Sequence, residues 1–147
     1  MEETIKSDDT KKKIIELFGK AKKSILMSTE LNSEFYNDDD VKNVMEDALK
    51  KVKSAKIIIT NDIESRKKDV KWLFDIARHD NKIQIKPCEK AMHWLIIDDK
   101  HIRLEKSHKI GIIGKENLFQ FDVPQIVTEI LKKKFYSWWD SEKSIDL

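Results

Sequence analysis

Residues 86–109, KPCEKAMHWLIIDDKHIRLEKSHK, gather the side chains best suited to chemistry. The segment holds three of the four histidines, His93, His101 and His108, and the single cysteine, Cys88. Histidine can act as a nucleophile, a general base or a metal ligand near neutral pH. The three histidines are spaced by eight and seven residues, whereas zinc sites usually contain closer ligand pairs. We therefore expect no metal and no cofactor, and a histidine-centred site is the chemical hypothesis that remains.

Three residues of this segment are candidates for lining such a site. His93 lies in an apolar strand beside Trp94, so it is either a core histidine with satisfied hydrogen bonds or a residue that contacts a ligand. Arg103 and Glu105 alternate on one face of the following strand, which favours a solvent-facing or cross-strand pair. The alternative is an inward pair, in which Arg103 could bind an anionic ligand through two parallel hydrogen bonds.

The size and charge of the chain limit the classes of function. It has 147 residues, enough for one domain with a proper core, and its 29 Lys and Arg against 27 Asp and Glu give a net charge of +2. This charge is too small to drive nucleic-acid binding by bulk field alone. One cysteine cannot form an internal disulfide, and no apolar run approaches the roughly 20 residues that span a bilayer. We expect a single cytoplasmic domain over residues 1–147, without membrane contact, in which residues 1–8 form a loose tail.

Hydrophobic periodicity predicts an alternation of helices and strands. Helices are expected over 7–24, 37–55, 62–80 and from Pro124 onward, and strands over 24–29, 56–60, 82–87 and 109–114. Residues 92–98 and 101–105 flank a polar turn and indicate a hairpin. Helical crossovers between apolar strands predict an α/β fold: a mixed, mostly parallel sheet with helices on both faces and an antiparallel edge.

Two clusters of charged or aromatic residues are better explained by structure than by function. The Asp38–Asp40 run could bind a metal, but it stands at a helix start, where an N-cap and the helix dipole account for it. Trp138 and Trp139 could stack bases beside the lysine run 132–134. Adjacent helix residues point in different directions, so at least one tryptophan should pack in the core. The inner side of this last helix is predicted to carry Ile126, Val127, Ile130, Leu131, Phe135, Trp138 and Trp139.

The order of elements resembles one half of the phospholipase D superfamily. KKSILMST (22–29) is similar to the first strand of that fold, ALKKVKSAKIIIT (48–60) to its second helix and strand, and ILKKKFYSWWDS (130–141) to its terminal helix. Residues 82–87 then run into a strand that ends in an Asp-Asp pair. The resemblance covers nearly the whole chain and implies the α/β fold of that family.

The family's catalytic signature is H-x-K-x-x-x-x-D followed by a Gly-Ser-x-Asn stretch. In the family, the histidine attacks phosphorus to form a phosphohistidine, while the lysine and the polar residues hold the phosphate oxygens. Alignment of this chain through Asp98 puts Ala91 at the histidine position and His93 at the lysine position. Glu105-Lys106-Ser107-His108 then stands in place of Gly-Ser-x-Asn. In this register, the chain lacks the nucleophile.

A second register does not restore the signature. Alignment of His93 with the nucleophile puts Leu95 where the lysine belongs and Lys100 where the aspartate belongs. The methyl side chain of alanine has no nucleophilic atom that could attack phosphorus. A carboxylate such as Glu105 would repel a phosphate rather than stabilise it. The resemblance therefore implies the fold of the family without its reaction.

The first functional hypothesis is a non-catalytic domain that acts as a ligand-sensing or protein-interaction module in a regulatory role. Such domains resemble the effector halves of some prokaryotic transcription regulators. The family's site lies between two halves, which implies a homodimer, and a DNA-binding domain would lie on a partner or on a longer chain. A small anionic or sugar-like ligand would bind in the remnant cleft. The residues expected to line this cleft are Glu30, His93, Arg103, Glu105 and His108.

Two other hypotheses stay open at this point. A phosphodiesterase or nuclease could have rebuilt its centre from His93 and His108 across a dimer. A nucleic-acid-binding module could use the lysine-rich helices, and its affinity would then fall steeply with salt.

Overall fold

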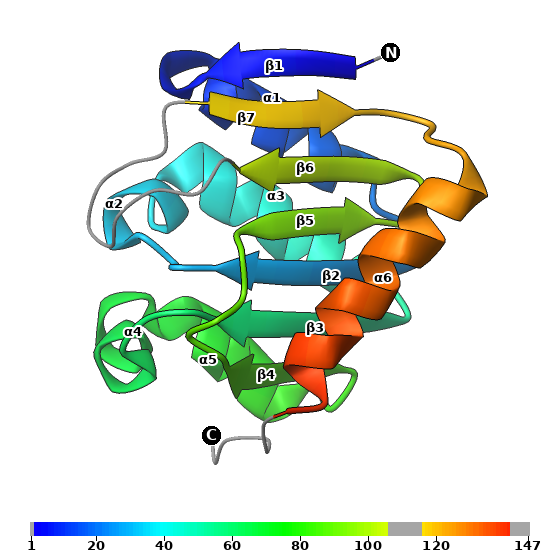
Figure 1. Ribbon diagram of the computed structural model, residues 1–147. Helices are drawn as coiled ribbons and strands as arrows, with labels where there is room; N and C mark the ends of the chain where they lie inside the picture. Colours follow the sequence, from blue (N-terminus) through cyan, green and yellow to red (C-terminus); the bar gives the residue numbers. More distant parts are fainter. Residues whose placement is uncertain (1, 106–115, 142–147) are drawn as a thin grey trace.

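Seven strands form one sheet in the order β1-β7-β6-β5-β2-β3-β4 in the computed structural model, which describes residues 2–105 and 116–141 (Figure 1). The strands are β1 (Glu2–Lys6), β2 (Ser24–Thr29), β3 (Ser54–Ile59), β4 (Ile83–Pro87), β5 (Trp94–Ile97), β6 (His101–Glu105) and β7 (Glu116–Gln120). The helices are α1 (Ser7–Lys20), α2 (Ser33–Tyr36), α3 (Asp39–Lys51), α4 (Ile63–Asp69), α5 (Lys71–His79) and α6 (Gln125–Trp139). None of the described helices is both long and apolar enough to cross a membrane.

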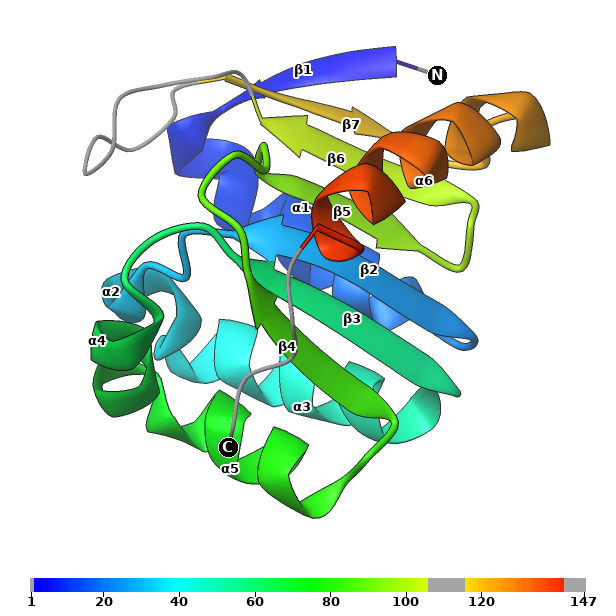
Figure 2. The same ribbon diagram turned by 60° about the horizontal axis from the view of Figure 1, so that its bottom comes forward.

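The prediction of an α/β fold with a mixed sheet and helices on both faces is confirmed. Helices α1, α3 and α5 cover one face, and α6 crosses the other (Figures 1 and 2). The sheet was expected to be mostly parallel, but most of its strand pairings are antiparallel. Only β2–β3 and β3–β4 are parallel, because only these pairs are joined by helical crossovers. The hairpin β5–β6 and strands β7 and β1 add four antiparallel pairings.

Two hydrophobic clusters, one on each face, hold the layers together. The larger lies under α1, α3 and α5 and contains Phe18, Met45 and Phe74, each at most 1% exposed. The smaller cluster lies under α6, where Phe135, Trp138 and Trp139 of the helix pack against strand residues. The strand residues of this smaller cluster include Leu26, Ile58, Ile96 and Ile102. Strands β2, β3 and β5 are buried on both faces, which explains why they read as continuous apolar runs.

Several expectations about the elements need correction. The N-terminal segment is not a loose tail, since Glu2–Lys6 pairs along its length with β7. The single helix predicted over 62–80 is divided at Val70, which is fully buried with φ −122° and ψ 54°. The segment before Val70, α4, buries none of its residues and lacks an apolar stripe that would keep it in line with α5. The strand predicted over 109–114 falls outside the described residues.

The inner face of α6 also differs from the prediction. Phe135, Trp138 and Trp139 are buried, so both tryptophans pack rather than stack bases. Ile126 and Ile130 are each 62% exposed. The buried stripe is set by Thr128, Phe135 and Trp138, which recur at helical spacing, and the two isoleucines lie on the opposite side of the helix.

Asp98 anchors the β5–β6 turn to the segment between α1 and β2. Its carboxylate accepts hydrogen bonds from the backbone N–H groups of Lys22, Lys23 and Ser24 at 2.7–3.1 Å. Its own N–H donates to the carbonyl of Ser24 at 2.9 Å. Asp98 and Asp99 have φ values of 56° and 57°, in the left-handed region that aspartate tolerates better than most residues.

The Asp98 anchor can be tested with its neighbour as the matched control. Asp98→Ala is expected to lower the free energy of unfolding by roughly 1.5–3 kcal/mol more than Asp99→Ala, because the first variant loses the hydrogen bonds of three backbone N–H groups to a carboxylate, whereas the second loses one surface contact with Lys132. Both residues have a positive φ, so the backbone strain introduced by alanine is common to the two variants. Urea unfolding followed by tryptophan fluorescence measures the difference, and equal losses would contradict the anchoring role.

Candidate functional site

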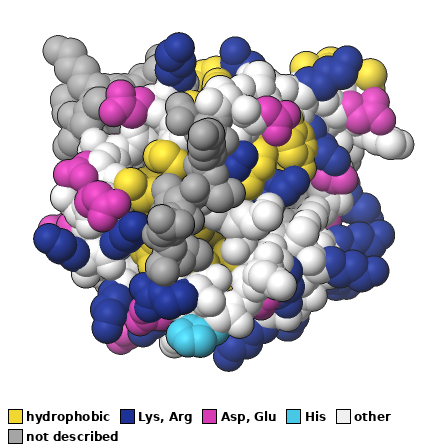
Figure 3. Space-filling model, turned by 90° about the horizontal axis from the view of Figure 1, so that it is seen from below, with side chains coloured by type: hydrophobic (Ala, Val, Ile, Leu, Met, Phe, Trp, Pro, Cys, Tyr) yellow, Lys and Arg dark blue, Asp and Glu magenta, His cyan; other side chains and the backbone are white. Residues whose placement is uncertain are grey.

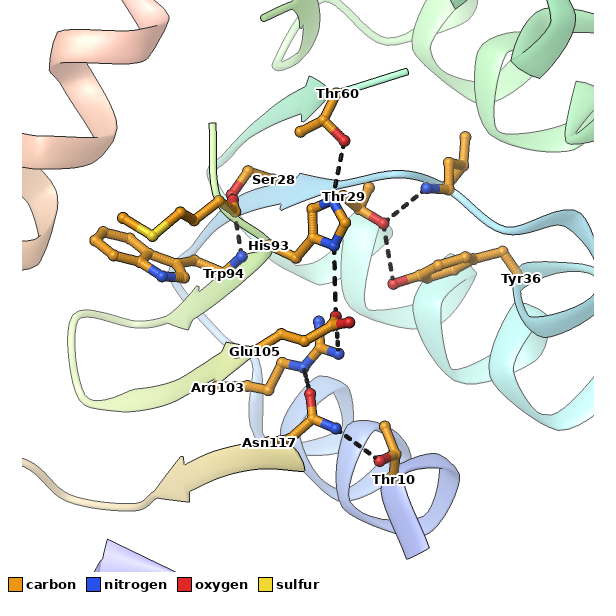
Figure 4. A network of polar contacts seen from close by, with 12 residues as sticks. Thr10, Ser28, Thr29, Tyr36, Thr60, His93, Trp94, Arg103, Glu105 and Asn117 are labelled. Atoms are coloured by element: carbon orange, nitrogen blue, oxygen red, sulfur yellow. Dashed lines mark hydrogen bonds and ion pairs between the residues drawn. The ribbon is translucent and has the colours of Figure 1, made fainter. Parts of the chain in front are cut away.

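A polar network joins residues from five separate segments at the edge of the sheet where β2, β3 and β6 end (Figure 4). The guanidinium of Arg103 donates to the carboxylate of Glu105 at 2.6 Å and to the amide oxygen of Asn117 at 2.7 Å. The amide nitrogen of Asn117 donates to Thr10 Oγ1 at 2.9 Å. Beyond Glu105, the ring of His93 lies between that carboxylate and Thr60. In spatial order, the polar network consists of Thr60, His93, Glu105, Arg103, Asn117 and Thr10.

The charges of this network are removed from water. The side chains of Arg103 and Glu105 are each 9% exposed, and that of His93 is 18% exposed. A buried charge is tolerated when it is paired and its remaining hydrogen-bonding capacity is satisfied. Arg103 and Glu105 meet this condition through each other, through Asn117 and through His93. The pair lies inward, so the favoured solvent-facing prediction is wrong and the inward alternative is correct.

The two ring contacts of His93 favour one tautomer of a neutral imidazole. Its Nδ1 lies 3.5 Å from Glu105, and its Nε2 lies 3.0 Å from the hydroxyl of Thr60. An ionised carboxylate can only accept, so the proton of a neutral ring belongs on Nδ1. Nε2 then accepts from the Thr60 hydroxyl, and its lone pair is occupied. His93 is therefore a satisfied, half-buried histidine whose ring nitrogens are both engaged within the protein.

The main chain around His93 is held from two sides. The hydroxyl of Ser28 on β2 donates to the carbonyl of Met92 and accepts from the N–H of Trp94 at 3.0 Å. The carbonyl of His93 accepts from the N–H of Glu105 at 3.0 Å. These bonds fix residues 92–94 before β5 begins, so the imidazole is aimed at Glu105 by the backbone as well as by its side-chain contacts (Figure 4).

Tyr36 lies beside the polar network and comes from α2. Its Oη accepts from Thr29 Oγ1 at 3.5 Å, and Thr29 Oγ1 in turn accepts from the N–H of Leu31 at 2.9 Å. Burial raises the pKa of Tyr36 above its ordinary value. The positive charge of the neighbouring Arg103 offsets part of this rise. The phenol is thus neutral near physiological pH and adds a polar group without adding charge.

The structure brings together only part of the predicted site. His93, Arg103 and Glu105 lie in contact, as the inward hypothesis expects. Glu30 follows β2 and is half-buried, and the hydrogen bonds of the polar network do not include it. His108 lies outside the described residues.

His79, His93 and His101, the histidines of the described residues, do not assemble into a metal site. His101 lies at the start of β6, at the opposite end of the hairpin from His93. Its Nδ1 accepts from the N–H of Asp122 at 3.1 Å, and burial lowers the pKa of His101 below its ordinary value. Within residues 2–105 and 116–141, no group of three His, Cys, Asp or Glu side chains is placed to hold a metal ion.

The Asp38–Asp40 run also has a structural role. Asp38 caps α3 by accepting from the N–H groups of Asp40 and Val41. Its carboxylate also forms an ion pair with Lys11 at 3.0 Å. The N-cap prediction is confirmed.

The positions of the family signature lie in unrelated surroundings. Ala91 is 8% exposed and belongs to the hydrophobic cluster under α6, not to the polar network. Asp98 lies beyond the far end of β5 from His93, and a four-residue strand spans roughly 13 Å. In the register through Asp98, the aspartate position thus holds the anchor of a turn, and the histidine position would hold a buried methyl group.

Four members of the site were not predicted from the sequence: Thr10, Tyr36, Thr60 and Asn117. Asn117 and Thr10 are 107 residues apart, and the pairing of β7 with β1, which leads directly into α1, brings them together. The one available signal was the position of Thr60, which directly follows a buried parallel strand. Polar residues at the carboxyl ends of parallel strands gather at the same edge of a sheet.

Comparisons with known proteins identify the fold. No family model matches the chain, and no curated protein matches it. Among solved structures, Nuc from Salmonella typhimurium, a phospholipase D family member, is 13% identical with a TM-score of 0.74, and the match covers 100% of this chain and 99% of Nuc. The chain has a phospholipase D-like fold. NucT from Helicobacter pylori is 14% identical with a TM-score of 0.66, and 99% of each chain is covered.

A third structure with this phospholipase D-like fold belongs to a larger protein. TrmBL2, an archaeal chromatin protein, is 18% identical to this chain with a TM-score of 0.73. The match covers 98% of this chain but 54% of TrmBL2, so the chain spans about half of that protein. At these identities, the comparisons establish the architecture of the chain.

The energetic coupling within the polar network is testable by a double-mutant cycle. Arg103→Met and Glu105→Leu should each lower the free energy of unfolding by about 3–5 kcal/mol, since each leaves a buried charge without its partner. The double variant should lose clearly less than the sum, because no orphaned charge remains between them. Urea unfolding of the four proteins gives the coupling energy.

The exposed pair Arg78 and Asp75 on α5 provides the matched control, with side chains 48% and 39% exposed and an N–O distance of 2.8 Å. The same cycle on this pair should give under about 1 kcal/mol. Additive losses at Arg103 and Glu105, similar to those of the surface pair, would show that the buried pair does not organise the site.

Proposed function

We propose that this chain is a non-catalytic domain with a phospholipase D-like fold that senses a ligand or binds a protein in a regulatory role. The observation that supports the proposal is that Ala91, which the register through Asp98 puts at the histidine position, is a buried methyl group in an apolar cluster. Covalent catalysis at phosphorus needs an imidazole with an available lone pair. In this structure the Thr60 hydroxyl occupies Nε2 of His93, and this contact would have to break before that nitrogen could attack phosphorus.

The electrostatics of the site support the same proposal. A phosphodiester reaction requires positive groups that stabilise negative charge as it develops on phosphate oxygens. Here the positive charge of Arg103 is already matched by Glu105 at 2.6 Å. A phosphate approaching this point would meet a carboxylate, so the fold offers a site for recognition rather than for phosphoryl transfer.

The proposed ligand site is built on the exposed side of the polar network. His93 is the most accessible member of the His93–Glu105–Arg103 group, and an imidazole, a carboxylate and a guanidinium together suit a ligand with both donors and acceptors, such as a small sugar-like molecule or a small anion. We include Glu30, which directly follows β2 at this end of the sheet, and we include His108 as part of the sequence hypothesis. A homodimer and a cytoplasmic location are part of the same proposal.

The test compares turnover and ligand binding in the same set of proteins. The wild-type chain and the variants His93→Ala and His79→Ala are incubated with bis(4-nitrophenyl) phosphate, single-stranded DNA and duplex DNA. His79 is exposed on α5 and serves as the matched histidine control. We expect no product above the buffer rate in any of them. Hydrolysis that is lost in His93→Ala and retained in His79→Ala would overturn the proposal in favour of a phosphodiesterase or nuclease with a rebuilt centre.

The binding arm is a thermal-shift screen of the same three proteins with sugars, nucleotides and inorganic phosphate. A ligand at 100 times its Kd stabilises a folded protein by about 2.7 kcal/mol, which gives a readily measured rise in Tm. We expect a rise that is retained in His79→Ala and lost in His93→Ala. A rise that is equal in all three proteins would place the ligand elsewhere on the chain.

A further inference from the structure

Seven exposed lysines gather at the edge of the sheet opposite the polar network. They lie on three segments: the end of α1 and the residues after it, the end of α3 and the residues after it, and the β5–β6 turn. We call this surface the basic end, and its members are Lys20, Lys22, Lys23, Lys50, Lys51, Lys53 and Lys100. In Figure 3, dark-blue Lys and Arg side chains gather along the right-hand side of the molecule, the side on which β2 and β3 begin in Figure 1.

The three segments are fastened to one another, so the lysines form a single surface. The N–H of Lys53 donates to the carbonyl of Lys23 at 2.8 Å, which joins the α3–β3 segment to the α1–β2 segment. The carboxylate of Asp98 accepts from the N–H groups of Lys22 and Lys23, which joins the β5–β6 turn to the same place. Lys82 Nζ donates to the carbonyl of Lys50 at 3.0 Å and adds the start of β4. The backbone of the basic end is therefore held in place before any partner arrives.

The positive charge of the basic end is not neutralised within the protein. In the described part of the chain, the ammonium groups of these seven lysines form no ion pair within 4.0 Å of a carboxylate. Asp99 in the β5–β6 turn is paired with Lys132 at 3.1 Å, Asp98 is bonded to backbone amides, and Asp47, one turn before Lys50 and Lys51, is exposed and forms no ion pair with them. The C-termini of α1 and α3 also point here and favour lysines, but each contributes only about half a negative charge. Helix dipoles therefore explain one or two of the lysines and leave most of the surplus unmatched.

From this arrangement we propose that the basic end binds the sugar-phosphate backbone of duplex nucleic acid. Lysine ammonium groups contact phosphate oxygens as point charges and carry no information about base sequence. The inference goes beyond the proposed function, since the surface lies at the other edge of the sheet from His93 and needs none of the residues of the polar network. Binding through such an array is independent of sequence and strongly dependent on salt.

The composition of the basic end favours nucleic acid over a lipid surface. Proteins that lie on membranes combine basic side chains with exposed apolar ones that enter the headgroup region. The exposed large hydrophobic residues of the described chain are Met92, Ile126 and Ile130, and none of them is on the three segments of the basic end. A surface of lysines without exposed apolar side chains therefore suits the phosphates along a nucleic-acid backbone.

The experiment measures binding of a fluorescein-labelled 20-base-pair duplex by anisotropy at several salt concentrations. The basic-end variant carries Lys22→Gln, Lys23→Gln, Lys51→Gln and Lys53→Gln. The hydrogen bonds of Lys22, Lys23 and Lys53 described above use only backbone atoms, so these substitutions keep them. The control variant removes four exposed lysines that lie off the basic end, through Lys12→Gln, Lys68→Gln, Lys90→Gln and Lys133→Gln.

For the wild-type chain, we expect the logarithm of the association constant to fall with the logarithm of salt concentration with a slope of about −4, as for four to five neutralised phosphates. The basic-end variant should bind at least about tenfold more weakly at low salt, and its slope should be shallower by about one for each lysine that no longer reaches a phosphate. The control variant should stay within about twofold of the wild type.

Three outcomes would overturn the inference. These are an absence of duplex binding by the wild-type chain at low salt, equal weakening in both variants, and tighter binding to phosphatidylserine vesicles than to the duplex. Near-ultraviolet circular dichroism of the tryptophans shows whether each variant is folded, so unfolding is distinguished from weaker binding by a folded protein.

Discussion

A buried guanidinium must be matched by a carboxylate and by further hydrogen bonds, and Arg103 imposes this condition on the whole edge of the sheet. Glu105, two residues along the same strand, supplies the charge, and Asn117 supplies the remaining acceptor. Glu105 in turn contacts His93, and Asn117 donates a hydrogen bond to Thr10. Because these partners come from α1, β6, β7 and the segment before β5, one buried charge fixes how four parts of the chain meet.

The contacts that hold the fold do not include a catalytic nucleophile. The layers are held by two hydrophobic clusters and by the Asp98 anchor, neither of which needs a nucleophile. The phospholipase D-like fold can therefore persist when alanine stands at position 91, while the polar edge of the sheet is satisfied by groups of the protein itself. Under the proposed function, this site would exchange the internal partners of its charges for a ligand's groups rather than stabilise a charged transition state.

The sequence predicts what depends on local pattern. Residues 24–29 are a strand because an unbroken apolar run is buried on both faces, and Asp38 is an N-cap because it precedes an amphipathic helix. The direction of Arg103 could not be read in this way, since His101, Ile102 and Arg103 are all buried and period-two alternation fails in β6. Contacts such as Thr10 with Asn117 depend on strand order, and strand order is set by the packing of the whole sheet.

The most direct measurement is the intact mass of the chain after incubation at high concentration with a chemically activated phosphodiester, with the acid-labile adduct preserved at alkaline pH. Our account predicts an unchanged mass, because Ala91 has no nucleophile and both nitrogens of His93 are engaged. A phosphoryl adduct that maps to His93 by fragmentation would contradict it, since that would show a histidine of this chain attacking phosphorus.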